Sequence, residues 1–471
     1  MRSAIAPIGV AARRRTSAPV GDGPRRTEPS APGPRPAGGR LTPQVLAPAG
    51  GYGSAVPELP AIPTDDRAAV EAWVAEHLGD VVLEGRDGVR SSPAFQGGQS
   101  AADAALADVD LRGYAGRRSE VLPVDRRGAS RLSPYIRHGL LPLPHVWDAV
   151  ASVGARDRGK FRDELLWQEY ARHVYARVGP DLARPLRHVP PSAPTKWQDP
   201  WDRTLACMAF TTDELRGDGW LVNQTRMWLA SQWTVRGGHD WREGEDRFFR
   251  HLLDGSRAAN RLGWQWTVGA GTGRPYGFAR WQVEKRAPEL CRGCALRTRC
   301  PIQEFPDAPS GASVASPDAL RADPDPERTG GPAHAVRSGD PSAVWLTAES
   351  LGTRDPALVA RPELPAVFVF DRARLAGWRL SSKRLVFLAE TLGELATHRT
   401  LELHVGDPGE VLEGRALAAT WTPVPGWRRL ERRLDVVEQH PWPWLARPHR
   451  RSAKSFSAWR KGLPADRQRG A

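Results

Sequence analysis

Two hydroxyl side chains stand in a segment that is typical of a helix start. Within residues 128–139, Ser133 can cap a helix and Pro134 suits the first helical position. The free N–H groups at such an end attract phosphate, and the hydroxyls of Ser130 and Ser133 add donors. The segment therefore predicts an anion site, with an ordinary capped helix as the alternative.

A carboxylate and an indole share one face of a predicted helix. Glu164 and Trp167 are three residues apart, and Gln168 follows Glu164 by about one turn. A carboxylate beside an indole suits a planar ligand. The alternative is a half-buried amphipathic helix whose tryptophan packs in the core.

A third group of polar and aromatic side chains lies between Asp254 and Trp266. It includes Asn260 and ends in a Trp-Gln-Trp element, so hydrogen-bonding groups precede rings that could contact a heterocycle. Because the chain has 19 tryptophans, some clustering is expected without any ligand.

The four cysteines are Cys207, Cys291, Cys294 and Cys300. A disulfide scaffold is not expected in a chain of this length without a secretory signal. The Cys-x-x-Cys pair predicts metal binding, and four thiolates satisfy Zn²⁺. Four free buried cysteines are the alternative.

These groups need elements that position them, and the first part of the chain is helical. Residues 61–303 show helical periodicity, with long amphipathic stretches at 160–177 and 220–235. A short helix is expected after Thr64, its predicted N-cap. This part is therefore predicted to be a mostly α domain.

The second part has the pattern of a parallel sheet. Residues 304–340 are rich in Pro, Gly, Asp and Ser and predict a flexible linker. After it, short apolar runs and one helical stretch indicate a β–α–β unit in a short α/β domain over residues 341–440. The predicted strands cover 343–347, 366–370 and 401–405, and the helix covers 382–397.

The length and charge of the chain limit the classes of protein to which it can belong. A chain of 471 residues is long for one core, and no apolar run reaches the roughly 20 residues of a membrane span, so we expect a cytoplasmic protein. Of the net charge of +13, residues 1–60, predicted to be disordered, carry +5 and the basic tail carries +7 over residues 443–471. Charge alone is therefore weak evidence for a folded DNA site.

In their order along the chain, these segments resemble the FAD-binding domain of the photolyase/cryptochrome family, from Phe95 to Trp281. The shared motifs are Ser-x-Leu-Ser-Pro-Tyr, Glu-Leu-x-Trp, Gly-Trp at 219–220, Asp-Trp-Arg-x-Gly-Glu at 240–245 and Asn-x-x-Gly-Trp-Gln-Trp at 260–266. The resemblance implies a mostly helical FAD-binding domain.

The resemblance also implies a role for each matched residue. The flavin would be held by Asp254 paired with Arg226, and Asn260 would face its reactive central nitrogen. Trp264 and Trp241 would begin a chain that delivers electrons. The remaining implied contacts are Tyr114, Ser130, Leu132, Ser133 and Glu164 to FAD, and Glu164, Trp167, Met227 and Trp266 to a pyrimidine dimer.

Three positions depart from the family pattern. Gln168 and Gln224 stand where photolyases carry arginine, and Ser256 replaces a common acidic residue. Charged contacts to phosphate are stronger than neutral ones, so these changes weaken lesion binding more than FAD binding.

The cysteines resemble those of the iron–sulfur bacterial cryptochromes and photolyases, which implies one 4Fe-4S cluster held by Cys207, Cys291, Cys294 and Cys300. The spacing from Cys294 to Cys300 is shorter than that subgroup leads us to expect. Zinc stays the alternative.

Residues 341–440 resemble the antenna domain of photolyases, placed here after the flavin domain in a permuted order. Together, the resemblances imply light-driven electron transfer from reduced FAD to a pyrimidine photoproduct in DNA, with damaged and in particular single-stranded DNA as partner. A cryptochrome-type light or redox sensor without lyase activity is the alternative.

Overall fold

Short apolar strands form a six-stranded sheet in the last third of the chain. The strands are β3 (Val336–Arg337), β4 (Ala343–Leu346), β5 (Ala366–Asp371), β6 (Leu401–Gly406), β7 (Leu417–Thr420) and β8 (Val436–His440). Their order is β3-β8-β7-β4-β5-β6, and every neighbouring pair is parallel except β3 and β8. The predicted combination of a helical part and a parallel α/β part is confirmed.

The computed structural model describes residues 58–64, 66–190, 197–306 and 310–468. The predicted disordered lead at 1–60 lies outside the described residues, apart from its last three. Across the described ranges, no helix is both long and apolar enough to span a bilayer.

Alternate residues of the central strands face two different layers, as the two-residue period of a strand requires. Val344 and Phe368 belong to the core cluster that includes Leu385 of α17 (Ser382–Ala396). Trp345 and Val367 belong to a second cluster on the opposite face, with Trp427 of α19 (Pro425–Leu430). Both faces of β4 are buried, which explains its continuous apolar run.

The helix α1 (Arg67–Leu78) packs beside α17. The N-cap of α1 is Asp66, whose carboxylate accepts a hydrogen bond from the Ala68 N–H at 3.0 Å, and not Thr64 as predicted. A carboxylate at this position also interacts favourably with the helix dipole. The other helices around the sheet are α15 (Pro356–Ala360), α16 (Arg372–Trp378) and α18 (Pro408–Val411).

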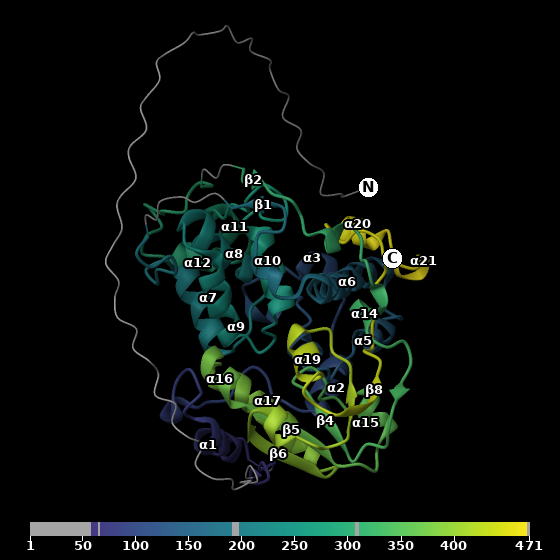
Figure 1. Ribbon diagram of the computed structural model, residues 1–471. Coiled ribbons are helices and arrows are strands. Elements are labelled where there is room, and N and C mark those ends of the chain that lie inside the picture. The colour runs from purple at the N-terminus through teal and green to yellow at the C-terminus, as the bar shows by residue number, and fades with distance from the viewer. Residues whose placement is uncertain (1–57, 65, 191–196, 307–309, 469–471) are drawn as a thin grey trace, which may run out of the picture. The chain divides into compact units, whose positions relative to one another are not determined.

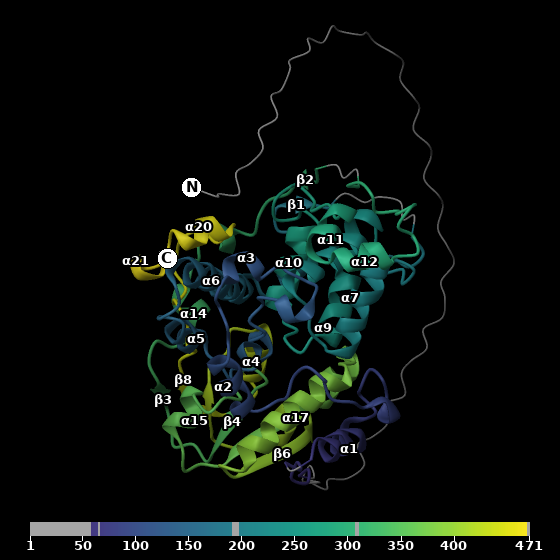
Figure 2. The same ribbon diagram turned by 180° about the vertical axis from the view of Figure 1, so that it is seen from behind.

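In the described part of residues 61–303, every regular element except the two-residue strand β1 (His188–Val189) is a helix. Its longest helix is α6 (Ala155–Val178), and a π-helical turn over Gln232–Arg236 continues α8 (Asn223–Ser231). In Figures 1 and 2, α7 to α12 gather at one end of the unit and the sheet lies at the other. The remaining helices are α2 (Gln99–Ala107), α3 (Tyr114–Arg117), α4 (Ser133–Arg137), α5 (Leu143–Ala149), α7 (Ala206–Gly217), α9 (Trp241–His251), α10 (Arg257–Thr267), α11 (Arg280–Arg286) and α12 (Pro288–Gly293).

Residues 310–340 carry regular elements of their own. The strand β2 (Ala312–Ser313) pairs with β1 (His188–Val189), and α13 (Asp318–Arg321) and α14 (Pro326–Gly330) both pack against α6. β3 then joins the edge of the main sheet.

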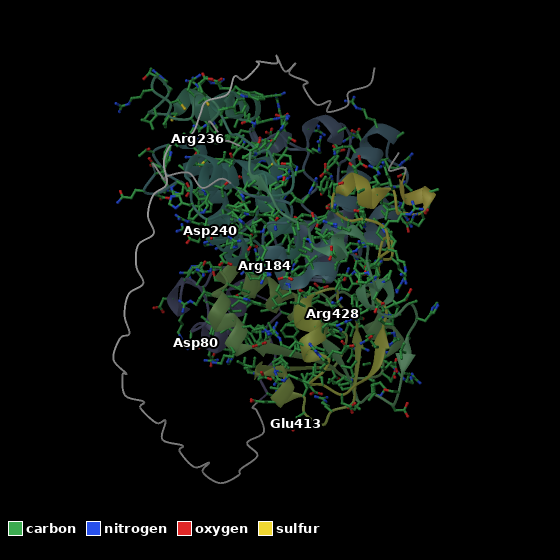
Figure 3. The ribbon with its side chains drawn as sticks, turned by 45° about the horizontal axis from the view of Figure 1, so that its top comes forward. Asp80, Arg184, Arg236, Asp240, Glu413 and Arg428 are labelled. Atoms are coloured by element: carbon green, nitrogen blue, oxygen red, sulfur yellow. The ribbon has the colours of Figure 1, made fainter. Side chains whose placement is uncertain are left out.

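The C-terminal segment also lies on α6. Figures 1 and 2 show α20 (Phe456–Arg460) and α21 (Ala465–Gln468) beside this helix. Trp459 is fully buried there and donates to the His173 Nδ1 at 2.9 Å. The Arg428 guanidinium of α19, labelled in Figure 3, donates to the Ala176 carbonyl at the end of α6 at 3.1 Å. The described residues form one compact unit within Ala55–Ala471.

Candidate functional site

A cavity of about 300 Å³ lies between the helices and the carboxyl ends of β4 and β5. Its walls come from α4, α6, α8 and α10 on one side and from α17 and the loop after β4 on the other. This volume falls in the range of pockets that bury small-molecule ligands. The lining includes Ser133, Gln168, Arg226, Asp254, Asn260, Glu349 and Arg384.

The Arg226 and Asp254 side chains form an ion pair in the wall of this cavity. The Arg226 Nη2 lies 2.7 Å from the Asp254 Oδ2. The Asp254 Oδ1 is buried without a hydrogen-bond partner, and so is the Asn260 Nδ2 on the neighbouring helix. Buried polar atoms in native proteins are normally paired, so these two atoms indicate a polar ligand.

Charge in the lining favours an anionic ligand. Six arginines face three carboxylates: Arg137, Arg172, Arg226, Arg257, Arg374 and Arg384 against Asp254, Glu349 and Asp371. His138, also in the lining, adds no positive charge at neutral pH, because burial lowers its pKa to about 3. Glu245 and Glu169, outside the lining, pair with Arg257 and Arg172, which leaves Arg384 as the lining arginine for which the described residues give no ion pair. This cation and the unpaired hydrogen-bonding groups fit a heterocycle that carries phosphate. FAD has this composition.

The residues predicted to bind phosphate are arranged differently from expectation. Ser133 is the first residue of α4 and does not cap it; its Oγ accepts a hydrogen bond from the Trp220 Nε1 at 3.0 Å. The N-cap position is Leu132, which has no side-chain acceptor, so the predicted cap was wrong. Ser133 lines the cavity, whereas Ser130 and Leu132 are not part of its lining.

The predicted carboxylate–indole pair, Glu164 and Trp167, is not part of the lining of this cavity. The Glu164 Oε1 pairs with the Lys160 Nζ at 2.8 Å and with the Arg118 Nε at 3.2 Å. Trp167 stacks on Phe456 of α20, with ring centroids 4.0 Å apart. Gln168, one residue further along α6, does line the cavity.

Two other predicted contacts also lie outside the cavity lining. Tyr114 is buried against the Phe161 ring at 5.3 Å, and burial raises the pKa of its hydroxyl. Trp266 is 42% exposed and packs beside Tyr276 at 5.6 Å, so it offers an open ring on the surface.

The predicted electron-relay tryptophans are both buried, but their rings do not pair. Trp264 contacts Phe248 at 5.0 Å, and the described ring contacts of Trp241 do not include Trp264. The rings of Trp264 and Trp233 both lie against Gly244, since a Cβ there would lie 2.2 Å from the Trp264 ring and 2.9 Å from the Trp233 ring. Trp201 packs on Trp233 at 5.0 Å. Trp201 and Trp233 were not predicted from the sequence, because they belong to no matched motif.

All four cysteines line one small cavity, of about 20 Å³, between α7, α11 and α12. Burial raises the pKa of Cys207 to about 12 and that of Cys291 to about 11. Within the described residues, no group of three or more Cys, His, Asp or Glu side chains is placed to hold a single metal ion. Arg236, labelled in Figure 3, fixes the end of the cysteine loop by donating to the Glu304 carbonyl at 2.7 Å.

Comparison with known proteins gives a family match for one of the segments that line the cavity. Residues 161–285 match the family described as the FAD binding domain of DNA photolyase. The deoxyribodipyrimidine photo-lyase of Vibrio cholerae is 33% identical over 166 residues, which cover 32% of this chain and 35% of the relative. That of Thermus thermophilus is 34% identical over 195 residues, covering 38% of this chain and 44% of the relative. The chain therefore spans less than half the length of these relatives.

Two solved structures are also similar to this chain over part of its length. A bacterial class III photolyase from Agrobacterium tumefaciens is 27% identical with a TM-score of 0.35, covering 41% of this chain and 44% of that one. A Synechocystis cryptochrome is 26% identical with a TM-score of 0.37, covering 42% of this chain and 45% of that one. The family match and the sequence relatives support a photolyase-type FAD-binding domain in the helical part.

Proposed function

We propose that the chain is an FAD-dependent, photolyase-like protein that uses light to transfer an electron from reduced FAD to a pyrimidine photoproduct in DNA. The observation that carries the proposal is the Arg226–Asp254 ion pair with the unpartnered Asp254 Oδ1 and Asn260 Nδ2 beside it. These atoms lie within the segment that matches the FAD-binding family. When bound, FAD supplies the excited electron donor, because no amino-acid side chain does this chemistry.

The side chains of the cavity have separate tasks in this proposal. Arg226 holds one oxygen of Asp254, so the other is free to accept a hydrogen bond from a ring N–H. Asn260 presents an amide donor from the first turns of α10 to the same ligand. Burial of both groups keeps water from competing for these hydrogen bonds.

Lesion binding would use the surface outside the cavity. The exposed Trp266 ring could stack on an unpaired base, a contact worth about 1–3 kcal/mol. The Gln224 amide donates to the Tyr276 hydroxyl at 3.2 Å and offers no cation to phosphate. A flipped lesion costs a few kcal/mol to unstack, so single-stranded or loosely paired damaged DNA is the favoured partner.

The cysteine cavity supports a cluster as the second cofactor. Four sulfur ligands around one cavity are the donor set of a 4Fe-4S cluster. A cluster spreads its ligands over four irons, so its thiols need not converge on one point as they must around Zn²⁺. We therefore propose Cys207, Cys291, Cys294 and Cys300 as cluster ligands, with structural zinc as the alternative.

A cryptochrome-type sensor is the second candidate function, and one contact favours it. Trp167, which matches a lesion-contacting position, is stacked on Phe456 of the chain's own C-terminal segment. The neutral side chains of Gln168 and Gln224, which stand where photolyases carry arginine, also favour a sensor. A sensor would use light-driven redox change without cleaving a base dimer.

The deciding assay illuminates fully reduced protein with oligonucleotides that contain a cyclobutane dimer or a 6-4 photoproduct. Single-stranded and duplex substrates are compared at low and physiological salt, and restored bases are quantified. We expect restoration to be greatest with single-stranded substrate at low salt. If neither lesion is restored, the lyase proposal fails and the sensor takes first place.

A further inference from the structure

Arg384 brings a buried positive charge from the α/β part into the wall of the cavity. It lies in the first turn of α17 and is only 5% exposed. Its Nη1 donates to the Phe249 carbonyl at 2.6 Å, and its Nη2 donates to the Gly255 carbonyl at 2.7 Å. These bonds fix the guanidinium beside the turn that carries Asp254.

Arg384 differs from the other arginines of the lining in its lack of a counter-ion. The other five each have a carboxylate partner: Arg226 with Asp254, Arg137 with Glu349, Arg374 with Asp371, Arg257 with Glu245 and Arg172 with Glu169. Within the described ranges, no carboxylate forms an ion pair with Arg384. The hydrogen bonds of Arg384 go to neutral carbonyls and its guanidinium lies 4.6 Å from the centre of the Phe249 ring, so no carboxylate neutralises this buried charge. A ligand anion would supply the missing counter-charge.

A second guanidinium lies at the same place. The Arg137 Nε donates to the Gly255 carbonyl at 3.0 Å, so Arg137 and Arg384 share one acceptor. Their mutual repulsion adds to the effect of burial, which lowers the pKa of Arg384 to about 9. Two like charges on one carbonyl favour an anion that spans both.

The position next to the Arg384 guanidinium is a glycine, Gly255, which leaves room for this side chain. A Cβ there would lie 2.5 Å from the Arg384 Nη1, so any side chain would displace the guanidinium. The position of Arg384 is therefore determined by packing as well as by hydrogen bonds. Gly255 follows Asp254 directly, so Arg384 acts on the same turn that would read the flavin ring.

We propose that Arg384, with Arg137, forms the subsite for the pyrophosphate of FAD and makes the cavity select FAD over flavins that lack a pyrophosphate. This inference rests on the proposed function. The planar guanidinium fork matches phosphate oxygens in charge and geometry. The Asp254 and Asn260 groups would contact only the ring, which riboflavin and FAD share, so the arginines supply the discrimination.

The test measures the affinities of FAD and riboflavin by flavin fluorescence after bound flavin is removed from the full chain. In Arg384→Gln we expect FAD affinity to fall about 10- to 100-fold while riboflavin affinity is unchanged, because one charge-assisted hydrogen-bonding group is lost. Arg384→Lys, which keeps the charge without the fork, should lose less. Lys383→Gln is the matched control, since Lys383 is the neighbouring buried cation on α17 and pairs with Glu84 outside the cavity.

An equal loss of FAD and riboflavin affinity in Arg384→Gln would overturn the proposal, since Arg384 would then only position the Asp254 turn. Unchanged affinities would overturn it too. If the variant does not fold, inorganic pyrophosphate is titrated into the wild-type protein; it should compete with FAD and not with riboflavin, and absence of competition refutes the subsite. A wild-type protein that binds neither flavin would instead refute the proposed function.

Discussion

Single residues in the cavity wall lower the stability of the protein alone, because they present buried polar or charged groups that only a ligand can pair. The unpartnered Asp254 Oδ1 and Asn260 Nδ2, and the Arg384 guanidinium, which has hydrogen bonds but no counter-ion, are each unfavourable in the protein alone. Such local conflicts are typical of functional sites, because the ligand supplies the missing partners. This is the strongest structural reason to place FAD here.

Sequence reasoning found one side of this site and missed the other. The family resemblance implied the Arg226–Asp254 pair, and both residues belong to the matched segment. Arg384 and Glu349 lie far along the chain, in the antenna-like region to which no flavin contact was assigned, so only the tertiary structure brings them to the cavity. Long-range contacts of this kind leave no local pattern in a single sequence.

Replacement of Trp233 tests the route by which electrons reach the cavity. The rings of Trp264 and Trp233 both lie against Gly244, and Trp233 in turn packs on Trp201 at 5.0 Å. Among the described residues, Trp241 has no contact with another aromatic ring. Electron-transfer rates fall steeply with distance between rings. We therefore expect Trp233→Phe to slow flavin photoreduction several-fold, and more than Trp241→Phe, as measured by flavin absorbance under blue light with a thiol reductant.

The exposed Trp281→Phe is the control for this series. Normal photoreduction in Trp233→Phe together with a severe defect in Trp241→Phe would support the route predicted from the sequence instead.

Among the helices and strands, those with a clear apolar pattern in the sequence were predicted correctly, and those with a weak pattern were not. The helix α17 and strands β4, β5 and β6 fall within one residue of their predicted limits, because their apolar runs are long or bounded by turn residues. β7 reads Leu-Ala-Ala-Thr, which has little β propensity, and it forms because its neighbours bury it on both faces. The predicted helix cap at Ser133 failed because α4 begins one residue earlier, with Leu132 at its N-cap, and the Ser133 hydroxyl accepts a hydrogen bond from Trp220 instead.

Glu169 makes the attachment of the C-terminal segment to α6 sensitive to pH. It is fully buried, accepts the Ala446 N–H at 3.0 Å, and burial raises its pKa to about 7. The folded state therefore binds this proton more tightly than the unfolded state, so the stabilisation is complete below pH 4.5 and is lost as pH rises to 7. Glu169→Gln should gain about 2 kcal/mol in unfolding free energy relative to wild type between pH 5 and pH 8.

Urea unfolding of both proteins at the two pH values measures this change. His173 lies 3.9 Å from the Glu169 Oε1, but burial lowers its pKa well below the usual value, so it carries little charge between these two pH values. A stability difference that is the same at pH 5 and pH 8 would show that Glu169 keeps an ordinary pKa.

Replacement of a cysteine tests the second cofactor. In Cys291→Ser we expect loss of iron and sulfide together with a fall of several kcal/mol in unfolding free energy, because the site links α7 to the loop after α12. Elemental analysis of anaerobically purified protein measures the metal, and Arg299→Ser, an exposed change in the same loop, is the control. Stoichiometric zinc without iron in the wild type would contradict the cluster.

At the scale of the whole molecule, the helical and α/β parts share one core and one cavity. Phe387 of α17 packs against Tyr135 of α4 at 5.8 Å, and Leu165 of α6 belongs to the same cluster as Phe370 of β5. The composition of residues 304–340 suggested a flexible linker, yet its described elements pair with β1 and β8 and pack on α6. Tertiary contacts therefore order segments whose composition alone favours flexibility.

The direct test of the account is the flavin content and FAD affinity of the full-length protein compared with its Asp254→Ala variant. We expect about one FAD per wild-type chain, and at least tenfold weaker FAD binding in the variant, since a buried acceptor for the ring is lost. Asp213→Ala, an exposed carboxylate paired with Arg203, should bind FAD like the wild type. A wild-type protein that binds no FAD, or a folded Asp254→Ala variant with wild-type affinity, would contradict the assignment of this cavity to FAD.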